Sequence, residues 1–224
     1  MNINRNELIL GLVDNSIHVH QKKYCGNFQS RLKCSKEFVD EIITYLKSYG
    51  FLARGEDDKN PFLDVNGNIV RLWDIMAIDT VNFSTMYFEA KDFPRCVCYE
   101  ATGLPKRYID EKMMLANKGS DIYLIFKEDM EWVEKKAEKK HCPTQKIIDE
   151  LIREGFAEIK NSKVHFIPYG NNLRYLMQEE NQRVDLEWIK CSMNQYKGED
   201  QYLWKISSML PISKLLERKL KQET

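Results

Sequence analysis

Two extended runs of residues, 69–78 and 85–91, constrain the fold of this chain more than any other feature. Six residues separate the runs, few enough to close a β-hairpin. Apolar side chains recur at helical spacing over residues 36–49 and 107–118, and residues 121–127, with IYLIF at their centre, are typical of a buried strand. The order helix, strand, strand, helix, strand therefore predicts an α/β fold in which helices flank a mixed central sheet.

The predicted elements divide the chain into a core and two extensions. Residues 36–127 form the expected core, with Ser35 as the N-cap of its first helix and residues 1–35 as an N-terminal extension. Residues 128–224 predict an accessory α+β region. Within it, residues 143–167 indicate a helix followed by a short hairpin, an order that ends a winged helix-turn-helix. Ordinary α+β packing units contain the same order, so both interpretations are kept.

Charge and composition narrow the classes of function. The 34 basic and 34 acidic residues cancel, so overall basicity gives no argument for nucleic-acid binding, although a local basic groove is compatible with it. The chain has no apolar run of about 20 residues, so we expect no membrane partner. The N-terminal residues do not resemble a secretory signal, and the six cysteines form no C-x-x-C pair. We therefore expect reduced thiols, no zinc site and a cytoplasmic location.

Asp74 and the sequence Glu89-Ala90-Lys91 are the candidate chemical groups. Side chains alternate across a strand, so Glu89 and Lys91 share one face, while Asp74 lies among apolar neighbours in the first strand of the hairpin. A hairpin can bring Asp74 close to Glu89, and two adjacent carboxylates repel each other unless a cation lies between them. Mg²⁺ suits such oxygen ligands. Lys91 would then contact an attacking water and the scissile phosphate.

This pattern resembles the signature of the PD-(D/E)xK nuclease superfamily, which has an Asp on the second core strand and (Asp/Glu)-x-Lys on the third. Asp74 and residues 89–91 take those places, and the element order over residues 36–127 is similar to the restriction-endonuclease-like core of that superfamily. The run that begins at Asp74 looks most like archaeal Holliday-junction resolvases and related restriction-type endonucleases. Trp73 stands where the proline of the motif is expected. The alternative interpretation is a surface Glu–Lys pair beside an Asp that caps a loop.

The resemblance implies a role for each residue. Asp74, Glu89 and the backbone carbonyl of Ala90 would bind Mg²⁺, for which Mn²⁺ would substitute, and Lys91 would orient or help deprotonate the hydrolytic water. Many members add a Glu from the first core helix, and Glu41 is the better candidate because it flanks the apolar stripe of that helix. An exposed helix carboxylate is the alternative for Glu41.

Basic residues near the start of the next helix are candidates for phosphate contacts. Lys106 and Arg107 follow a polar loop with Gly103 and Pro105, and they open the helix, so side-chain charge and the helix N-terminus would both favour an anion. An ordinary helix start without a ligand is the alternative. Lys112 lies in the same helix and could turn toward the site, but the sequence alone does not place it there.

Together these patterns predict an Mg²⁺-dependent endonuclease that hydrolyses phosphodiester bonds in DNA. Cutting both strands generally needs two active sites, so a homodimer is the expected assembly. A non-catalytic module is the alternative, either a DNA-binding one that uses residues 143–167 or a protein-interaction module. An RNA nuclease is a third interpretation.

Overall fold

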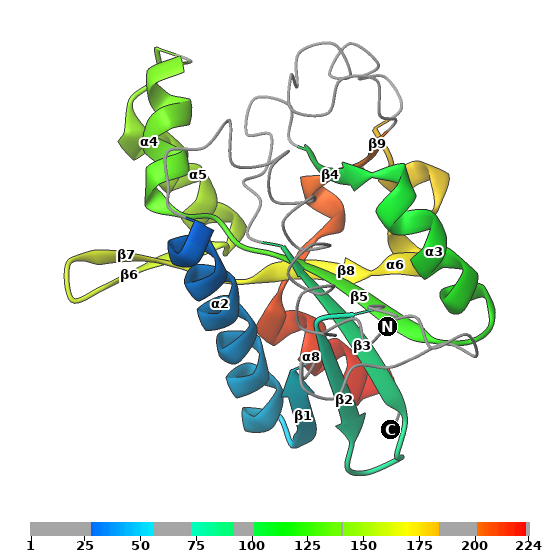
Figure 1. The fold of residues 1–224 in the computed structure, drawn as a ribbon. Helices are drawn as coiled ribbons and strands as arrows, with labels where there is room; N and C mark the ends of the chain where they lie inside the picture. Colours follow the sequence, from blue (N-terminus) through cyan, green and yellow to red (C-terminus); the bar gives the residue numbers. More distant parts are fainter. Residues whose placement is uncertain (1–27, 56–72, 92–100, 140, 184–200, 223–224) are drawn as a thin grey trace, which may run out of the picture.

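The computed structural model describes residues 28–55, 73–91, 101–139, 141–183 and 201–222. They contain a mixed six-stranded sheet in the order β1-β2-β3-β5-β8-β10 (Figure 1). β3 and β5 are parallel, and the other neighbouring strands of this sheet are antiparallel. Apolar clusters on both faces of the sheet include side chains from the helices. The predicted fold class, a mixed sheet flanked by helices, is therefore confirmed.

The bounds of the elements are as follows. The helices are α2 (Phe28–Ser48), α3 (Lys106–Asn117), α4 (Met130–Lys139), α5 (Thr144–Glu154), α6 (Leu173–Leu176) and α8 (Ile212–Gln222), with short 3-10 helices η2 (Glu179–Asn181) and η4 (Ile206–Ser208). The strands of the large sheet are β1 (Phe51–Gly55), β2 (Ile75–Asp79), β3 (Thr85–Lys91), β5 (Asp121–Phe126), β8 (Tyr169–Asn172) and β10 (Leu210–Pro211). Two smaller sheets pair β4 (Ala101–Pro105) with β9 (Gln201–Lys205) and β6 (Ala157–Lys160) with β7 (Lys163–Phe166). None of the described helices has both the length and the apolar character needed to cross a membrane.

One face of the large sheet packs against α2 and α8. Helical spacing puts Phe38, Ile42 and Leu46 on the same side of α2, where all three are buried in one apolar cluster. β3 contributes Met86, Phe88 and Ala90 to this cluster, and α8 adds further apolar side chains. Because strand side chains alternate, the remaining residues of β3 point to the opposite face.

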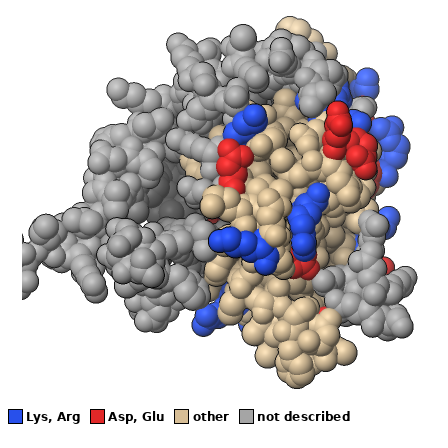
Figure 2. All heavy atoms as spheres, turned by 90° about the vertical axis from the view of Figure 1, so that its right-hand side faces the viewer, with Lys and Arg blue, Asp and Glu red and all other residues tan. Residues whose placement is uncertain are grey.

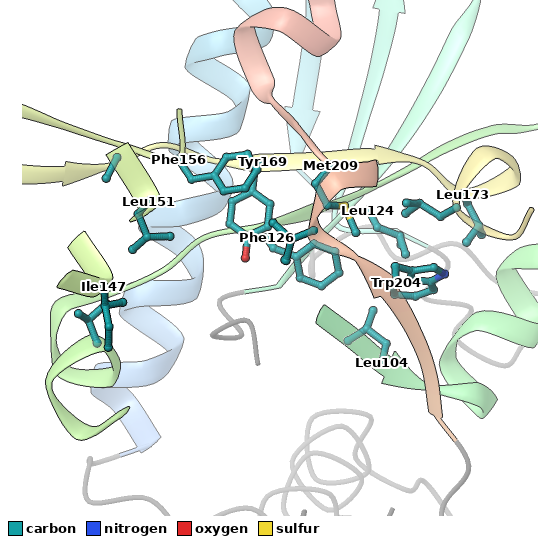
Figure 3. Packing of buried hydrophobic residues seen from close by; sticks show 14 of the residues in the cluster. Leu104, Leu124, Phe126, Ile147, Leu151, Phe156, Tyr169, Leu173, Trp204 and Met209 are labelled. Carbon is teal, nitrogen blue, oxygen red and sulfur yellow. The ribbon is translucent and has the colours of Figure 1, made fainter. Parts of the chain in front are cut away.

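The opposite face packs against α3, α4, α5, α6 and the β4–β9 pair. Figure 3 shows Phe126 of β5 among aromatic neighbours in this cluster. The ring centroid of Phe126 lies 6.1 Å from that of Tyr169 and 6.4 Å from that of Trp204. The ring of Phe156 stacks on that of Tyr169, with their centroids 4.3 Å apart. β5 is buried on both faces, as its continuous apolar run indicates.

The large sheet crosses the predicted boundary between residues 127 and 128. β8 pairs with β5, and β10 pairs with β8, so two strands from the C-terminal region continue the sheet. β9 from the same region pairs with β4 of the predicted core. Residues 128–224 therefore supply strands to the same sheet as residues 36–127, rather than only an appended unit.

Several boundaries differ from the sequence-based expectation. α2 begins at Phe28, so Ser35 lies within the helix and is not its N-cap. Residues 101–105 form β4 instead of a loop, because all five pair with the distant strand β9. The first hairpin strand begins at Ile75, and residues 69–72 lie outside the described residues.

The segment at residues 143–167 contains the predicted helix and hairpin. α5 ends at a C-cap Gly155 with φ 81°, a left-handed conformation that glycine adopts without strain. α4 packs against α5, and the β6–β7 hairpin that follows extends away from the large sheet (Figure 1). The order helix, helix, hairpin is compatible with a winged helix. α5 also buries Ile147, Ile148 and Leu151 in the apolar cluster that contains Phe126 and Tyr169, as an ordinary packing unit does.

Candidate active site

Hydrogen bonds to β3 fix the position of Asp74. Asp74 immediately precedes β2, and its N–H donates a 3.0 Å hydrogen bond to the carbonyl oxygen of Phe88. Its carboxylate also contacts β3, where Oδ2 accepts a 2.8 Å hydrogen bond from the N–H of Ala90. The hairpin thus holds Asp74 beside Glu89 on the neighbouring strand.

Strand alternation sets the direction of Glu89 and Lys91. Phe88 and Ala90 are buried in the cluster beneath α2 and α8, so Glu89 and Lys91 point to the other face. The parallel neighbour β5 gives the same assignment, because Glu89 pairs with Leu124, which is buried in the cluster that includes α3. Both charged side chains therefore project toward α3.

Asp74, Glu89 and Lys91 meet in one ion cluster. The Lys91 Nζ lies 2.5 Å from Glu89 Oε1 and 3.8 Å from Asp74 Oδ2, so a single cation contacts both carboxylates. The side chains of Asp74 and Lys91 are 34% and 25% exposed, whereas that of Glu89 is 8% exposed. The cluster is therefore open to solvent on the Asp74 and Lys91 side and closed at Glu89.

Lys112 is a fourth member that the sequence alone did not establish. Its Nζ lies 3.2 Å from Glu89 Oε2, and its side chain is only 8% exposed. Lys112 stands three residues after Ile109 and four before Ala116, and both of these are fully buried. Its place on the apolar side of α3 is the signal that identifies it, because a lysine there needs a buried counter-charge.

The charges of the cluster shift its pKa values in different directions. Burial would raise the pKa of Glu89, but the ammonium groups of Lys91 and Lys112 outweigh burial and hold it below its ordinary value. Burial would lower the pKa of Lys91, but Glu89 and Asp74 hold it above its ordinary value. Burial raises the pKa of Asp74 against the opposing charge of Lys91. The surroundings therefore shift the pKa values of the two carboxyl groups in opposite directions.

The oxygen atoms of this cluster fit a hard divalent cation. Asp74 and Glu89 already share one cation, the Lys91 ammonium group. Within the described ranges no group of three His, Cys, Asp or Glu side chains could enclose a metal. Mg²⁺ commonly binds through one or two carboxylates and keeps several waters or substrate phosphates as further ligands. Two carboxylates could therefore hold a divalent cation that keeps water or substrate as its other ligands, rather than a closed structural metal.

Glu41 does not join these residues. It belongs to α2, which packs on the opposite face of the sheet, and its carboxylate forms an ion pair with Lys127. Glu41 and Lys127 line a cleft of about 490 Å³ together with Tyr45 and residues of the β6–β7 hairpin. We therefore leave Glu41 out of the proposed metal site and assign it the ion pair with Lys127.

The candidate phosphate contacts at the start of α3 are only partly described. The Lys106 Nζ lies 5.3 Å from the ring centroid of Tyr202, a cation–π distance. The side chain of Arg107 lies outside the described residues, so its contact with phosphate stays a prediction. Tyr108, which follows these residues in α3, is 40% exposed.

Figure 2 shows the side of the molecule on which α3 lies in Figure 1. Basic and acidic side chains are interspersed over the surface coloured in this view, in agreement with a net charge of zero. The surface seen from this side therefore offers an anion scattered basic groups rather than a broad basic face.

Comparisons with known proteins give distant structural similarity. No protein-family model matches the sequence, and no curated protein matches it. The structure is similar to Hjc, a Holliday junction resolvase from the archaeal hyperthermophile Archaeoglobus fulgidus, with 12% sequence identity and a TM-score of 0.41. The similarity covers 81% of this chain and 98% of Hjc. At this identity and TM-score the similarity assigns neither residues nor an activity to this chain.

Proposed function

We propose that this protein is a divalent-metal-dependent nuclease that hydrolyses phosphodiester bonds in DNA. The observation that supports the proposal is the convergence of Asp74 and Glu89, 15 residues apart in sequence, on the Lys91 Nζ. Two carboxylates in a partly exposed cluster are ligands that a divalent cation can use, and the adjacent amine can position a water for metal-assisted hydrolysis.

Each residue has a distinct proposed role. Asp74 and Glu89 hold the cation, and the carbonyl of Ala90 is the proposed third protein ligand. Mg²⁺ is the proposed metal, with Mn²⁺ as a substitute, and when bound it supplies a Lewis acid that polarises the phosphoryl oxygen and lowers the pKa of water. Lys91, displaced from the carboxylates, orients the water and offsets the charge that develops on the phosphate.

A plasmid-nicking assay tests this function. The wild type should nick supercoiled DNA with Mg²⁺ or Mn²⁺ and should lose the activity in EDTA. Lys91→Met should lower the rate by about 100-fold or more, because it removes the proposed water-positioning group. Lys118→Met is the matched control, since Lys118 is an exposed lysine at the end of α3, and it should keep the wild-type rate. Metal-independent cleavage, or full activity of Lys91→Met, would contradict the proposal.

The product and the substrate class are separate outcomes of the same assay. Linear plasmid that forms without prior accumulation of nicked plasmid would support a homodimer, because two sites can then cut both strands in one binding event. Matched DNA and RNA duplexes distinguish a deoxyribonuclease from a ribonuclease. We expect cleavage of DNA.

A non-catalytic DNA-binding module is the second candidate, and the order α4, α5 and β6–β7 hairpin favours it. Such a module would shift DNA in a gel without metal and would be unaffected by Lys91→Met. A nuclease that also uses the hairpin would bind DNA but would depend on Lys91 for cleavage.

A further inference from the structure

The ion cluster is electrically balanced by two lysines. Asp74 and Glu89 carry two negative charges, and Lys91 and Lys112 carry two positive charges within 3.8 Å of them. A divalent cation placed between the carboxylates would leave a local excess of two positive charges. Even after Lys91 leaves the carboxylates, an excess of one positive charge stays at the site. Something anionic must offset this charge when the metal binds.

Lys91 and Lys112 differ in their ability to move away. The side chain of Lys91 is 25% exposed, so its ammonium group has solvent to turn into when a metal ion takes its place between the carboxylates. Lys112 is held between the buried positions of Ile109 and Ala116, and its own side chain is 8% exposed. Its ammonium group therefore stays on Glu89 Oε2 while Oε1 becomes available to a metal. A buried positive charge next to a metal ligand weakens metal binding, because water screens it poorly.

We propose that Lys112 makes the metal affinity of this site depend on phosphate, so that the divalent cation is held firmly only together with a phosphodiester. The inference rests on the proposed nuclease function and adds a residue-specific control to it. With the metal and Lys112 both at the site, the two carboxylates leave one positive charge without compensation. A phosphodiester group brings the negative charge that offsets it. Metal and DNA then bind cooperatively, and by linkage each strengthens the binding of the other by the same factor.

A purely orienting role for Lys112 predicts the opposite result. If Lys112 only aims Glu89 at the metal, its removal would leave the carboxylate less well placed and would weaken metal binding. If its charge opposes the metal, its removal strengthens metal binding when DNA is absent. The direction of the change therefore separates the two roles.

Mn²⁺ titration of the full chain, followed by the electron paramagnetic resonance signal of free Mn²⁺, tests the proposal. We would compare the wild type with Lys112→Met and Lys112→Gln, which remove the charge, and with Lys112→Arg, which keeps it. Gln also keeps a hydrogen-bond donor for Glu89. Lys118→Met again controls for the loss of one positive charge from α3. Each protein is titrated alone, with a phosphorothioate duplex that resists hydrolysis, and with an uncharged methylphosphonate duplex.

The expected results have a defined pattern. The phosphorothioate duplex should strengthen Mn²⁺ binding to the wild type by about 10-fold or more, and the methylphosphonate duplex should not. Lys112→Met and Lys112→Gln should bind Mn²⁺ about 10-fold more tightly than the wild type without DNA and should gain less from the duplex. Lys112→Arg and Lys118→Met should behave as the wild type does.

Two results would overturn the inference. One is unchanged or weaker Mn²⁺ binding by both charge-removing variants without DNA. The other is a wild-type Mn²⁺ affinity that the charged duplex does not alter. If the plasmid is nicked while either result is found, the inference fails and the proposed function stands. If no protein binds Mn²⁺ and no plasmid is nicked, both fail.

Discussion

Glu89 occupies the most constrained position of the ion cluster. Its two carboxylate oxygens contact different lysines, Oε1 that of Lys91 and Oε2 that of Lys112, and its side chain is 8% exposed. Removing one partner of such a buried ion pair leaves the other charge without compensation. The resulting loss of stability exceeds the net contribution of the intact pair to the free energy of unfolding. The two lysines therefore depend on Glu89 for their burial.

Glu89→Gln should lower the free energy of unfolding by about 3 kcal/mol near neutral pH, because it leaves two ammonium groups with less compensation. Chemical denaturation monitored by circular dichroism measures the change. In a Lys112→Met background the same substitution should cost less, because one buried ammonium group is already absent. Equal costs in the two backgrounds would show that Glu89 and Lys112 do not interact energetically.

The effect of Glu89→Gln should also depend on pH. The pKa of Glu89 in the folded protein lies below its ordinary value of 4.5, so its charge contributes stability above that pH. The contribution is lost as the pH falls through the lower pKa of the folded state, where Glu89 takes up a proton. The difference in unfolding free energy between wild type and variant should therefore be full above pH 4.5 and should shrink in more acidic solution. A difference that grows on acidification would contradict the assignment.

At this scale the sequence and the structure agree where the geometry is local. The alternation of β3 placed Glu89 and Lys91 on one face, and the hairpin placed Asp74 beside them. The position of Lys112 depends on how α3 is rotated against the sheet. The same holds for Glu41, whose pairing with Lys127 depends on the face of the sheet that α2 covers. The sequence of α3 alone does not fix how that helix is rotated, and the sequence of α2 alone does not fix which face of the sheet it covers.

At the scale of elements, β8 lies between β5 and β10 in the large sheet. Gly170 of β8 pairs with Ile125 and with Leu210. A Cβ atom at Gly170 would lie 1.9 Å from the carbonyl oxygen of Leu124. That oxygen belongs to the backbone of a central strand and cannot move without disrupting the sheet. The close approach of two strands thus requires glycine here.

Gly170→Ala should destabilise the protein by about 3 kcal/mol or more, as a severe overpacking substitution. Gly55→Ala in β1 is the matched control, because its Cβ would meet Val39 and Ile43 at ordinary distances of 3.5 and 3.7 Å. We expect Gly55→Ala to change stability by no more than about 1 kcal/mol. Thermal unfolding of both variants provides the comparison, and similar transitions for the two would contradict the packing argument.

Element types were predictable where the pattern is periodic. β3 begins and ends as the sequence indicates, and α5 stops at Gly155. Residues 101–105 were expected to be a loop, and this prediction was wrong. Their strand conformation comes from pairing with β9, which begins at Gln201. The sequence of a five-residue segment does not predict that it will pair with a strand so distant in the chain.

At the scale of the whole molecule, the C-terminal half completes the sheet that the N-terminal half begins. β8 covers the edge of β5, and α8 buries Ile212, Leu215 and Leu216 in the cluster that includes α2. The C-terminal region also contributes Tyr169 and Trp204 to the cluster on the opposite face. A chain that ended at residue 127 would expose one edge of β5 and large parts of both clusters.

A fragment comprising residues 1–127 should therefore lack a cooperative unfolding transition, whereas the full chain should have one. Differential scanning calorimetry and near-ultraviolet circular dichroism, with the full chain as reference, measure this directly. A fragment with its own cooperative transition and a defined aromatic signal would show that the predicted core folds independently.

By itself, the sequence determined the order helix, strand, strand, helix, strand, the hairpin and the shared face of Glu89 and Lys91. These depend on the period of a strand and the length of a connection, which are fixed within a few residues. Only the tertiary structure decided that Lys112 closes the ion cluster and that β8 and β10 extend the sheet. Those contacts join segments far apart in the chain, and their formation depends on the packing of whole elements against one another.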